Sequence, residues 1–252
     1  MKSSSDDLVE VLFVKSGLNH ETKQIPLFIQ QELALQKRRE SLSIETYRKQ
    51  ISLVKKIYSP ESIRKIILDH LRENLDRNTI HAALNWLNSP LGEKISLLEN
   101  SAQTPEGNKE ISKYLRQPTK HTATRSRLLQ LQRLDQAVHT TESLVDNKIS
   151  IQLIALSILS ETHARLKPST LKLITENIEK KRPLIRDKLS KNVLAIYMYT
   201  YRDLQDSELE KYILFSESEA GTKYFTAYYG AVKSALLISK KRLFRSKAYV
   251  NH

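Results

Sequence analysis

The sequence predicts an all-α protein, and three observations support this prediction. Its 252 residues include only five Gly and seven Pro, too few for a β-rich fold that needs a tight turn at each strand junction. Apolar residues recur at three- and four-residue steps along most of the chain, as in Ile44, Tyr47 and Ile51. Ser-Pro and Thr-Pro pairs mark helix starts, because the hydroxyl can cap a helix and Pro fits its first position. We expect about ten helices in a helical bundle or short solenoid.

The first half of the chain divides into helices at recognisable caps. Gly17 is expected to end a short first helix in the left-handed conformation, and Asn19 to cap the next, which ends in the charged residues Lys37–Glu40. An amphipathic helix is expected over Ile44–Tyr58, followed by one that begins at Pro60. Asn78 is expected to cap a helix that leads to Leu87.

Two short stretches of the chain resemble each other, "WLNSPLGEK" at Trp86–Lys94 and "FSESEAGTK" 129 positions later. In the first, Ser89 is expected to cap a helix, Pro90 to begin it, and Gly92 to allow close approach of the preceding helix. Ser218 and Gly221 occupy the equivalent positions in the second, although Glu219 replaces the proline. Both stretches are therefore predicted to be helix-to-helix corners.

The repeated corner suggests that the chain consists of two related helical halves. We assign residues 1–117 to the first half, with the Ser-Pro-Leu-Gly corner, and residues 118–252 to the second, with a degenerate corner. Thr104 and Pro105 repeat the capping device within the first half, while Ser207 and Glu210 have capping-box spacing in the second. Identity between the copies is thin, so chance similarity between helix corners is the alternative.

Several stretches resemble the bacterial family called domain of unknown function 2059. They are "VKSGL", "ALNWLNSPLGEKISLLENSAQTPEG", "RLDQAVHTTESLVD" and "YILFSESEAGTKYFTAYYGAV", in the order in which that family carries its recurring pieces. The resemblance implies an all-α fold and a periplasmic or secreted location. It implies no established activity and supplies no catalytic residue.

Composition excludes several classes of chemistry. The absence of cysteine rules out thiol catalysis, Cys-ligated zinc and disulfides. No nucleophile elbow, P-loop, dinucleotide fingerprint or H-E-x-x-H motif occurs. Acidic pairs such as Glu73 with Asp76 and Asp203 with Asp206 suit helix ends better than catalysis. We therefore expect neither an enzyme nor a bound metal or cofactor, with a hydrolase as a distant alternative.

Tyrosine is concentrated late in the chain, where two roles are open. A groove lined with rings could stack bases or hold a sugar or peptide, whereas helical spacing favours core packing. Tyr197 and Tyr201 share one helical face while Tyr199 points elsewhere, so the cluster cannot form one flat platform.

Charge gives the strongest indication of function. The formal net charge of +13 favours polyanionic partners, and the C-terminal tail carries five cations close together: Lys240, Lys241, Arg242, Arg245 and Lys247. Such a tail suits anionic lipid or nucleic acid, but it equally suits a solvated helix end. We expect a non-enzymatic interaction or structural protein of the bacterial envelope, binding a protein or an anionic envelope component. The alternative is a basic nucleic-acid-binding protein of the cytosol.

Membrane insertion is not expected from the sequence. The apolar run "LVEVLFV" near the N-terminus is too short to cross a bilayer and lacks a cleavage site. We therefore expect neither a signal peptide in this chain nor a transmembrane span. The oligomeric state does not follow from the sequence.

Overall fold

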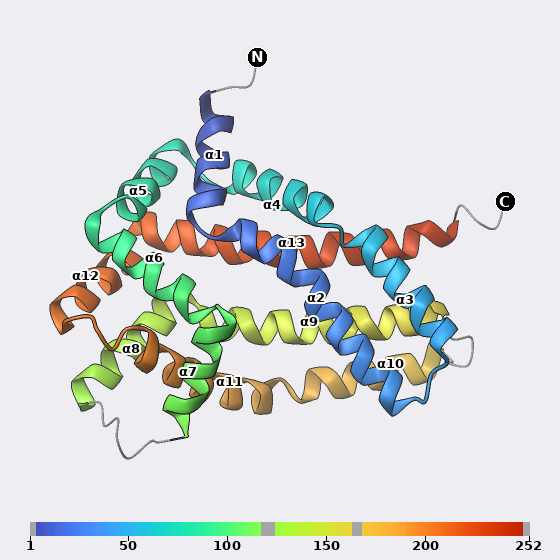
Figure 1. Cartoon of the computed structure of the whole chain (residues 1–252). Coiled ribbons are helices and arrows are strands. Elements are labelled where there is room, and N and C mark those ends of the chain that lie inside the picture. The colour runs from blue at the N-terminus through green and yellow to red at the C-terminus, as the bar shows by residue number, and fades with distance from the viewer. Residues whose placement is uncertain (1–3, 117–123, 163–167, 249–252) are drawn as a thin grey trace.

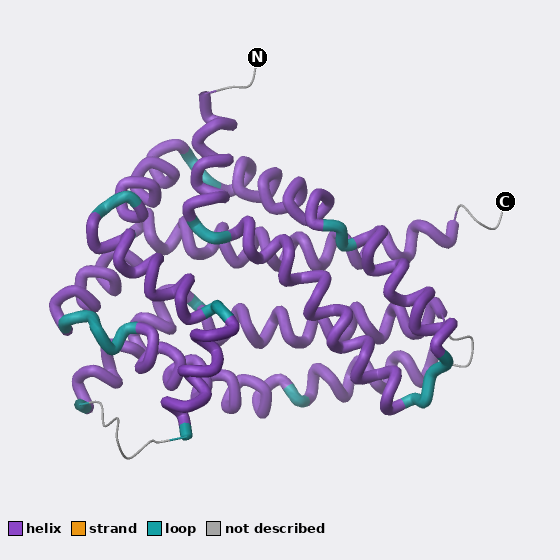
Figure 2. The backbone as a smooth tube through the Cα atoms, in the orientation of Figure 1, coloured by secondary structure: helices purple, strands orange, loops and turns teal. Residues whose placement is uncertain are grey.

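The computed structural model describes residues 4–116, 124–162 and 168–248, and side chains in 8–116, 124–162 and 169–239. Within these ranges it contains thirteen helices and no strand, which confirms the all-α prediction (Figure 1 and Figure 2). In chain order they are α1 (Ser4–Lys15), α2 (Leu18–Arg39), α3 (Ile44–Ile57), α4 (Pro60–Asn74), α5 (Arg77–Leu87), α6 (Pro90–Ala102), α7 (Pro105–Leu115), α8 (Arg125–Val138), α9 (Thr140–Thr162), α10 (Pro168–Lys180), α11 (Arg182–Thr200), α12 (Asp206–Glu217) and α13 (Glu219–Ala248).

The described helices outnumber the expected ten partly because two single-residue corners were not predicted. His139 joins α8 to α9 in the left-handed conformation, with φ of 53°. The Asp135 carboxylate supports this corner by accepting bonds from the Thr141 N–H at 2.8 Å and the Thr141 hydroxyl at 2.6 Å. Lys181 joins α10 to α11, where Pro183 in the first turn of α11 cannot continue the preceding helix. Neither corner contains the glycine that usually marks a helix end.

The helix start at Ser59 was predicted correctly, but three others were predicted two residues too late. Asn19 does not cap α2, because it lies inside that helix, which begins directly after Gly17. Gly17 has φ of 79°, in the left-handed region, as expected. Asp76 caps α5 in place of Asn78, because its carboxylate accepts a bond from the Thr79 N–H at 2.8 Å. The second copy deviates in the same way, since its capping box pairs Gln205 with Glu208 and not Ser207 with Glu210.

The two predicted corners share one local geometry. Ser89 donates to the Trp86 carbonyl at 2.7 Å and accepts from the Gly92 N–H at 3.0 Å. Ser218 makes the same pair of bonds, to the Phe215 carbonyl at 2.6 Å and from the Gly221 N–H at 3.0 Å. The expectation that both serines are N-caps is confirmed.

The corner glycines are required by backbone contact. A Cβ on Gly92 would lie 2.0 Å from the Trp86 carbonyl oxygen, and one on Gly221 would lie 2.0 Å from that of Phe215. Thr104 and Gly107 form a third corner of this kind, where a Cβ on Gly107 would lie 2.1 Å from the Ser101 carbonyl oxygen. Each glycine therefore lets the end of the preceding helix approach the new one closely.

Buried residues form two clusters, and each draws on both sides of residue 117. The larger cluster joins α1–α5 with α9 and α13, and the smaller joins Ile95 of α6 with α8, α11 and α12. Phe215 and Phe225 pack against both clusters. The proposed halves 1–117 and 118–252 thus share their cores, and their relation by duplication stays a prediction.

The long helix α13 crosses the molecule and packs along α4 and α5 (Figure 1). Its buried face places Ala227, Ala231 and Ala235 one turn apart, which lets another helix approach closely. Gly230 lies directly against His70 of α4, since a Cβ there would be 2.7 Å from the imidazole Nε2. Small residues on α13 therefore set its close contact with α4.

Helix α9 occupies a central place in the bundle, where it contacts α2, α3, α8, α10, α11 and α13. It is the described helix that is long and apolar enough to cross a membrane by length and composition. That is weak evidence for a span, because the core helix of a globular fold passes the same test, and Ile149, Ile154 and Ile158 are buried here. The expectation of no transmembrane span stays a prediction.

Candidate functional site

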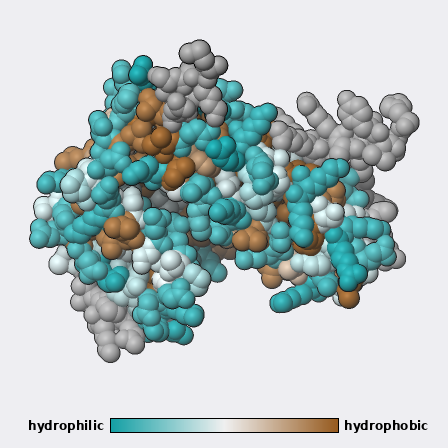
Figure 3. All heavy atoms as spheres, turned by 45° about the horizontal axis from the view of Figure 1, so that its top comes forward, coloured by the Kyte–Doolittle hydropathy of each residue, from teal (hydrophilic) through white to brown (hydrophobic). Residues whose placement is uncertain are grey.

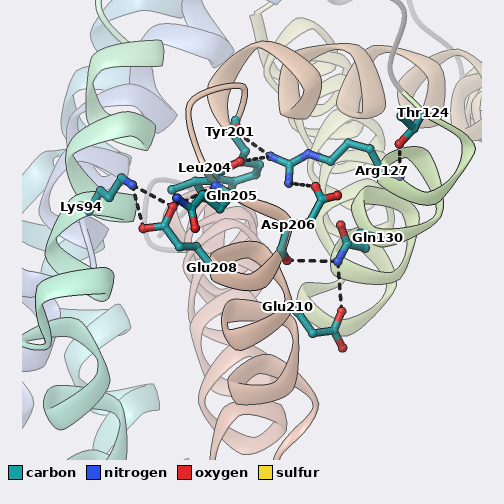
Figure 4. Close-up of polar contacts among 10 residues, drawn as sticks. All are labelled: Lys94, Thr124, Arg127, Gln130, Tyr201, Leu204, Gln205, Asp206, Glu208 and Glu210. Carbon is teal, nitrogen blue, oxygen red and sulfur yellow. Dashed lines mark hydrogen bonds and ion pairs between the residues drawn. The ribbon is translucent and has the colours of Figure 1, made fainter.

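An arginine fork secures the turn between α11 and α12 (Figure 4). The Arg127 side chain of α8 is only 13% exposed and donates to the carbonyls of Tyr201 at 2.6 Å and Leu204 at 3.0 Å. It also pairs with Asp206 at 2.8 Å. All the atoms that it bonds belong to the turn or to the start of α12, so its role is structural.

A second polar contact at this turn joins α6 to α12. Lys94 donates to both carboxylate oxygens of Glu208 at 2.8 Å, and the same carboxylate accepts the Gln205 N–H at 2.9 Å (Figure 4). Hydrogen bonding from Lys94 holds the pKa of Glu208 below its usual range. Glu208 therefore remains charged and caps its helix, and it is not available as an acid.

Two of the late tyrosines share one carboxyl group in the interior. Glu99 accepts hydrogen bonds from the Tyr201 hydroxyl at 2.7 Å and the Tyr212 hydroxyl at 3.2 Å. Burial raises the pKa of Glu99, and the two phenol bonds offset part of the rise. Trp86 stacks on Tyr212 with ring centroids 5.6 Å apart. Tyr197, Tyr201, Tyr212 and Tyr224 are thus core residues, as helical spacing favours. Tyr229 is half-buried and lines the polar groove described next.

The polar groove beside the α8–α9 corner is the next place where chemistry could occur. It has a volume of about 250 Å³ and is lined by His139, Glu142, Asp146 and Lys233 among others. Its acids are all engaged, since Glu142 pairs with Arg186 at 2.6 Å and Asp146 with Lys233 at 2.7 Å. The bond from Arg186 lowers the pKa of Glu142. These pairs tie α9 to α11 and α13, and they leave no free carboxylate for acid or base catalysis.

Metal ligands do not converge anywhere in the part of the chain that the structure describes, where no group of three His, Asp or Glu residues could hold an ion. The acidic pairs considered above serve separate helix ends. Asp76 caps α5, and Asp206 binds Arg127 at the start of α12. The sequence offered no candidate catalytic residue, and the described residues add none.

The surface that stands out is basic and lies on two adjacent helices. Helix α3 turns back beside α2 along one side of the molecule (Figure 1). Residues 23–56, which cover most of both helices, contain eight Lys or Arg against three Asp or Glu. This excess of five is a large part of the +13 carried by 252 residues. Lys49 is exposed but pairs with Glu45. We call the other exposed cations of these helices the α2–α3 face: Lys23, Arg38, Arg39, Arg48, Lys55 and Lys56.

The cations of the α2–α3 face have little internal compensation. Among the described residues none of their side chains has a hydrogen-bond or ion-pair partner. Of the three acids in the segment, Glu32 is buried and Glu45 is paired with Lys49 at 2.8 Å. Glu40, at the end of α2, is the acid of this segment that remains exposed and unpaired. An external anion would therefore meet uncompensated positive charge here.

The predicted basic tail lies outside the described side chains. These are Lys240, Lys241, Arg242, Arg245 and Lys247, whose backbone belongs to the last turns of α13. Helix α13 contacts α3 and α4, and its last turns pass beside the junction between those helices (Figure 1). The backbone of the tail thus leads away from the end of α3 that carries Lys55 and Lys56.

Sequence reasoning placed the positive charge at the tail and overlooked the α2–α3 face. A count of charge over successive segments would have found it, because residues 23–56 are basic without forming one run of cations. Glu99 and Arg127 had no such signal, since their partners lie 102 and 74 residues away along the chain. The α2–α3 face is accordingly the candidate functional site.

Comparison of the chain with models of known protein families, with curated proteins and with solved structures found no match.

Proposed function

We propose that this protein is a non-enzymatic helical interaction protein that binds an anionic partner through the α2–α3 face. The observation that supports this most directly is the set of six exposed cations without partners among the described residues. Unpaired surface cations of one sign attract a polyanion and raise its local concentration. The interior carboxylates and arginines are, in contrast, engaged in holding the helices together.

The location proposed for this activity is the bacterial envelope. The resemblance of "VKSGL" and "NWLNSPLGEK" to an exported helical family supports it. Anionic lipid head groups and acidic polymers of the envelope offer the complementary charge. Fractionation of cells that express the native gene tests this, and recovery of the protein only with the cytosol would contradict it.

The binding experiment compares two variants of equal charge. The first replaces Arg38, Arg39, Arg48 and Lys55 with Gln, and the second replaces four exposed cations at the other end of the molecule in the same way: Arg77, Lys109, Arg125 and Lys211. The four substitutions in each variant lower its formal charge from +13 to +9. Any difference between the variants therefore reports the position of the charge and not its amount.

On phosphatidylglycerol-containing vesicles, each cation near the surface contributes about 1 kcal/mol. We expect the first variant to bind roughly two to three orders of magnitude more weakly than wild type. The second variant should stay close to wild type. Equal binding by the two variants would contradict the α2–α3 face as the site.

Duplex DNA in the same experiment tests the nucleic-acid alternative. Clustered cations on helix surfaces contact phosphates without reading bases, so any such binding should be independent of sequence. With four phosphate contacts, it should weaken roughly a hundredfold for a fourfold rise in salt. Binding to DNA but not to anionic vesicles would favour the cytosolic alternative over the envelope.

A further inference from the structure

The α2–α3 face carries exposed apolar side chains as well as cations. On α2, Leu27 is 46% exposed and both Phe28 and Leu35 are 42% exposed, while Ile44 at the start of α3 is 61% exposed. The opposite side of α2 is buried through Ile25, Ile29 and Leu33. Helix α2 therefore presents apolar groups to the core on one side and to the outside on the other.

The apolar and basic residues follow one another along the same outward surfaces. Arg38 and Arg39 stand three and four residues after Leu35, which places them on the next turn of the same side. From Leu27 to Arg39 the helix advances by about 18 Å. On α3, Arg48 stands four residues and Lys55 eleven residues after Ile44, so these three also share a side. The face combines apolar groups with flanking cations on both helices.

We propose that this face docks on the surface of an anionic lipid bilayer, with Leu27, Phe28, Leu35 and Ile44 entering the head-group region. This inference rests on the proposed function, because it names the anionic partner. A bilayer surface offers apolar acyl chains beneath negative head groups, and so it stabilises both kinds of side chain. Duplex DNA attracts the cations through its phosphates but offers no apolar region for the exposed apolar side chains. Lys and Arg can also extend along the interface while their apolar neighbours go deeper.

Apolar residues are also exposed elsewhere on the molecule. Leu97, Leu129 and Leu214 are more than half exposed, but they lie on α6, α8 and α12 at the other end of the molecule (Figure 1). The side shown in Figure 3 likewise has hydrophobic residues in separate islands among hydrophilic ones. These three leucines provide a control with similar exposure and a similar change in polarity.

The test replaces Phe28, Leu35 and Ile44 with Ser in one variant and Leu97, Leu129 and Leu214 with Ser in the control. Partitioning to vesicles of phosphatidylglycerol and phosphatidylcholine is measured by co-sedimentation. Each apolar side chain that leaves water strengthens binding by roughly fivefold, so the first variant should lose about two orders of magnitude. The control should bind like wild type. Circular dichroism of both variants shows that each retains its helices.

The outcomes separate this inference from the proposed function. If the Gln variant of the α2–α3 face loses vesicle binding but the Ser variant does not, the anionic site stands and docking through apolar contact is overturned. If wild type binds DNA and not vesicles, the bilayer is the wrong partner. If wild type binds neither, both the inference and the proposed function fall. Loss of binding in both test variants with both controls intact supports the bilayer.

Discussion

Replacement of Gly92 by Ala tests the reason for the glycine at the helix corner. The added Cβ would lie 2.0 Å from the Trp86 carbonyl oxygen and 2.9 Å from its carbon. Non-bonded atoms prefer separations of about 3.5 Å, so the end of α5 would have to move by more than about 1 Å. A backbone carbonyl cannot turn aside as the end of a flexible side chain can.

The close contact and helix propensity predict changes in stability of opposite sign for Gly92→Ala. Overpacking costs typically about 1 to 3 kcal/mol, whereas Gly to Ala in a helix would by itself stabilise by up to about 1 kcal/mol. We expect a net loss of about 1 to 2 kcal/mol for Gly92→Ala and a similar loss for Gly221→Ala. Gly230→Ala should cost less, because its Cβ would meet the movable His70 imidazole and no backbone atom.

Equilibrium urea unfolding measures these differences. The chain has one tryptophan, Trp86, which belongs to the corner itself and stacks on Phe215 with centroids 4.6 Å apart. Its fluorescence therefore reports local opening, while far-UV circular dichroism reports loss of helix. A Gly92→Ala protein that is as stable as wild type or more stable would refute the close-contact explanation.

Three further predictions concern the interior residues Glu99, Arg127 and Tyr58, and the first two each have a surface residue for comparison. Burial raises the pKa of Glu99, so its contribution to stability is present below the unfolded pKa and is lost as pH rises through the folded one. Glu99→Gln should therefore gain stability relative to wild type as pH rises from about 4 to about 8. Thr79 hydrogen bonds hold the pKa of Asp76 below its usual range, so Asp76→Asn should lose stability relative to wild type as pH rises toward about 4 and stay at a constant difference above it. A pH profile parallel to that of wild type throughout would contradict either assignment. Arg127→Lys should cost about 2 to 4 kcal/mol in urea unfolding by leaving buried carbonyls unpaired, and Arg133→Lys, on the exposed face of the same helix, under about 1 kcal/mol. Equal losses of stability in the two variants would show that the bonds from Arg127 to the turn contribute no more than an ion pair on the surface. Tyr58 is buried and its hydroxyl has no hydrogen-bond partner among the described residues, so Tyr58→Phe should leave the melting temperature unchanged or raise it; a fall of several degrees would reveal a missed partner.

Local sequence signals predicted the fold class and the corners well because their causes are local. Helical periodicity over Ile44–Tyr58 needs no knowledge of the partner helix. The Ser89 cap and the Gly92 contact involve residues within a few positions of each other. Two caps were predicted two residues too late, at Asn78 instead of Asp76 and at Ser207 instead of Gln205. Asn and Ser are favoured cap residues, so the sequence did not exclude them.

Tertiary features could not be predicted in this way. The His139 corner was missed although it is local, because a histidine gives no warning of a helix end and the supporting bonds from Thr141 to Asp135 leave no sequence signal. The bond from Tyr201 to Glu99 joins residues 102 positions apart. The α2–α3 face was hidden for another reason, since cations that alternate with core residues look like the ordinary solvated side of two helices. Only the structure shows that they lack partners.

Depth-dependent quenching tests docking of the α2–α3 face most directly. Phe28→Trp places a reporter at the centre of the proposed apolar contact, and Leu97→Trp places one on an exposed site at the other end of the molecule, each in a Trp86→Phe background. Vesicles that contain brominated acyl chains quench a tryptophan only where it enters the bilayer surface.

We predict that anionic brominated vesicles quench the reporter at position 28 and shift its emission to the blue, while the reporter at position 97 is unaffected. Neutral brominated vesicles should quench neither, because the cations would have no partner. Equal quenching at the two positions, or none at position 28 under conditions in which the protein sediments with the vesicles, would contradict docking through this face.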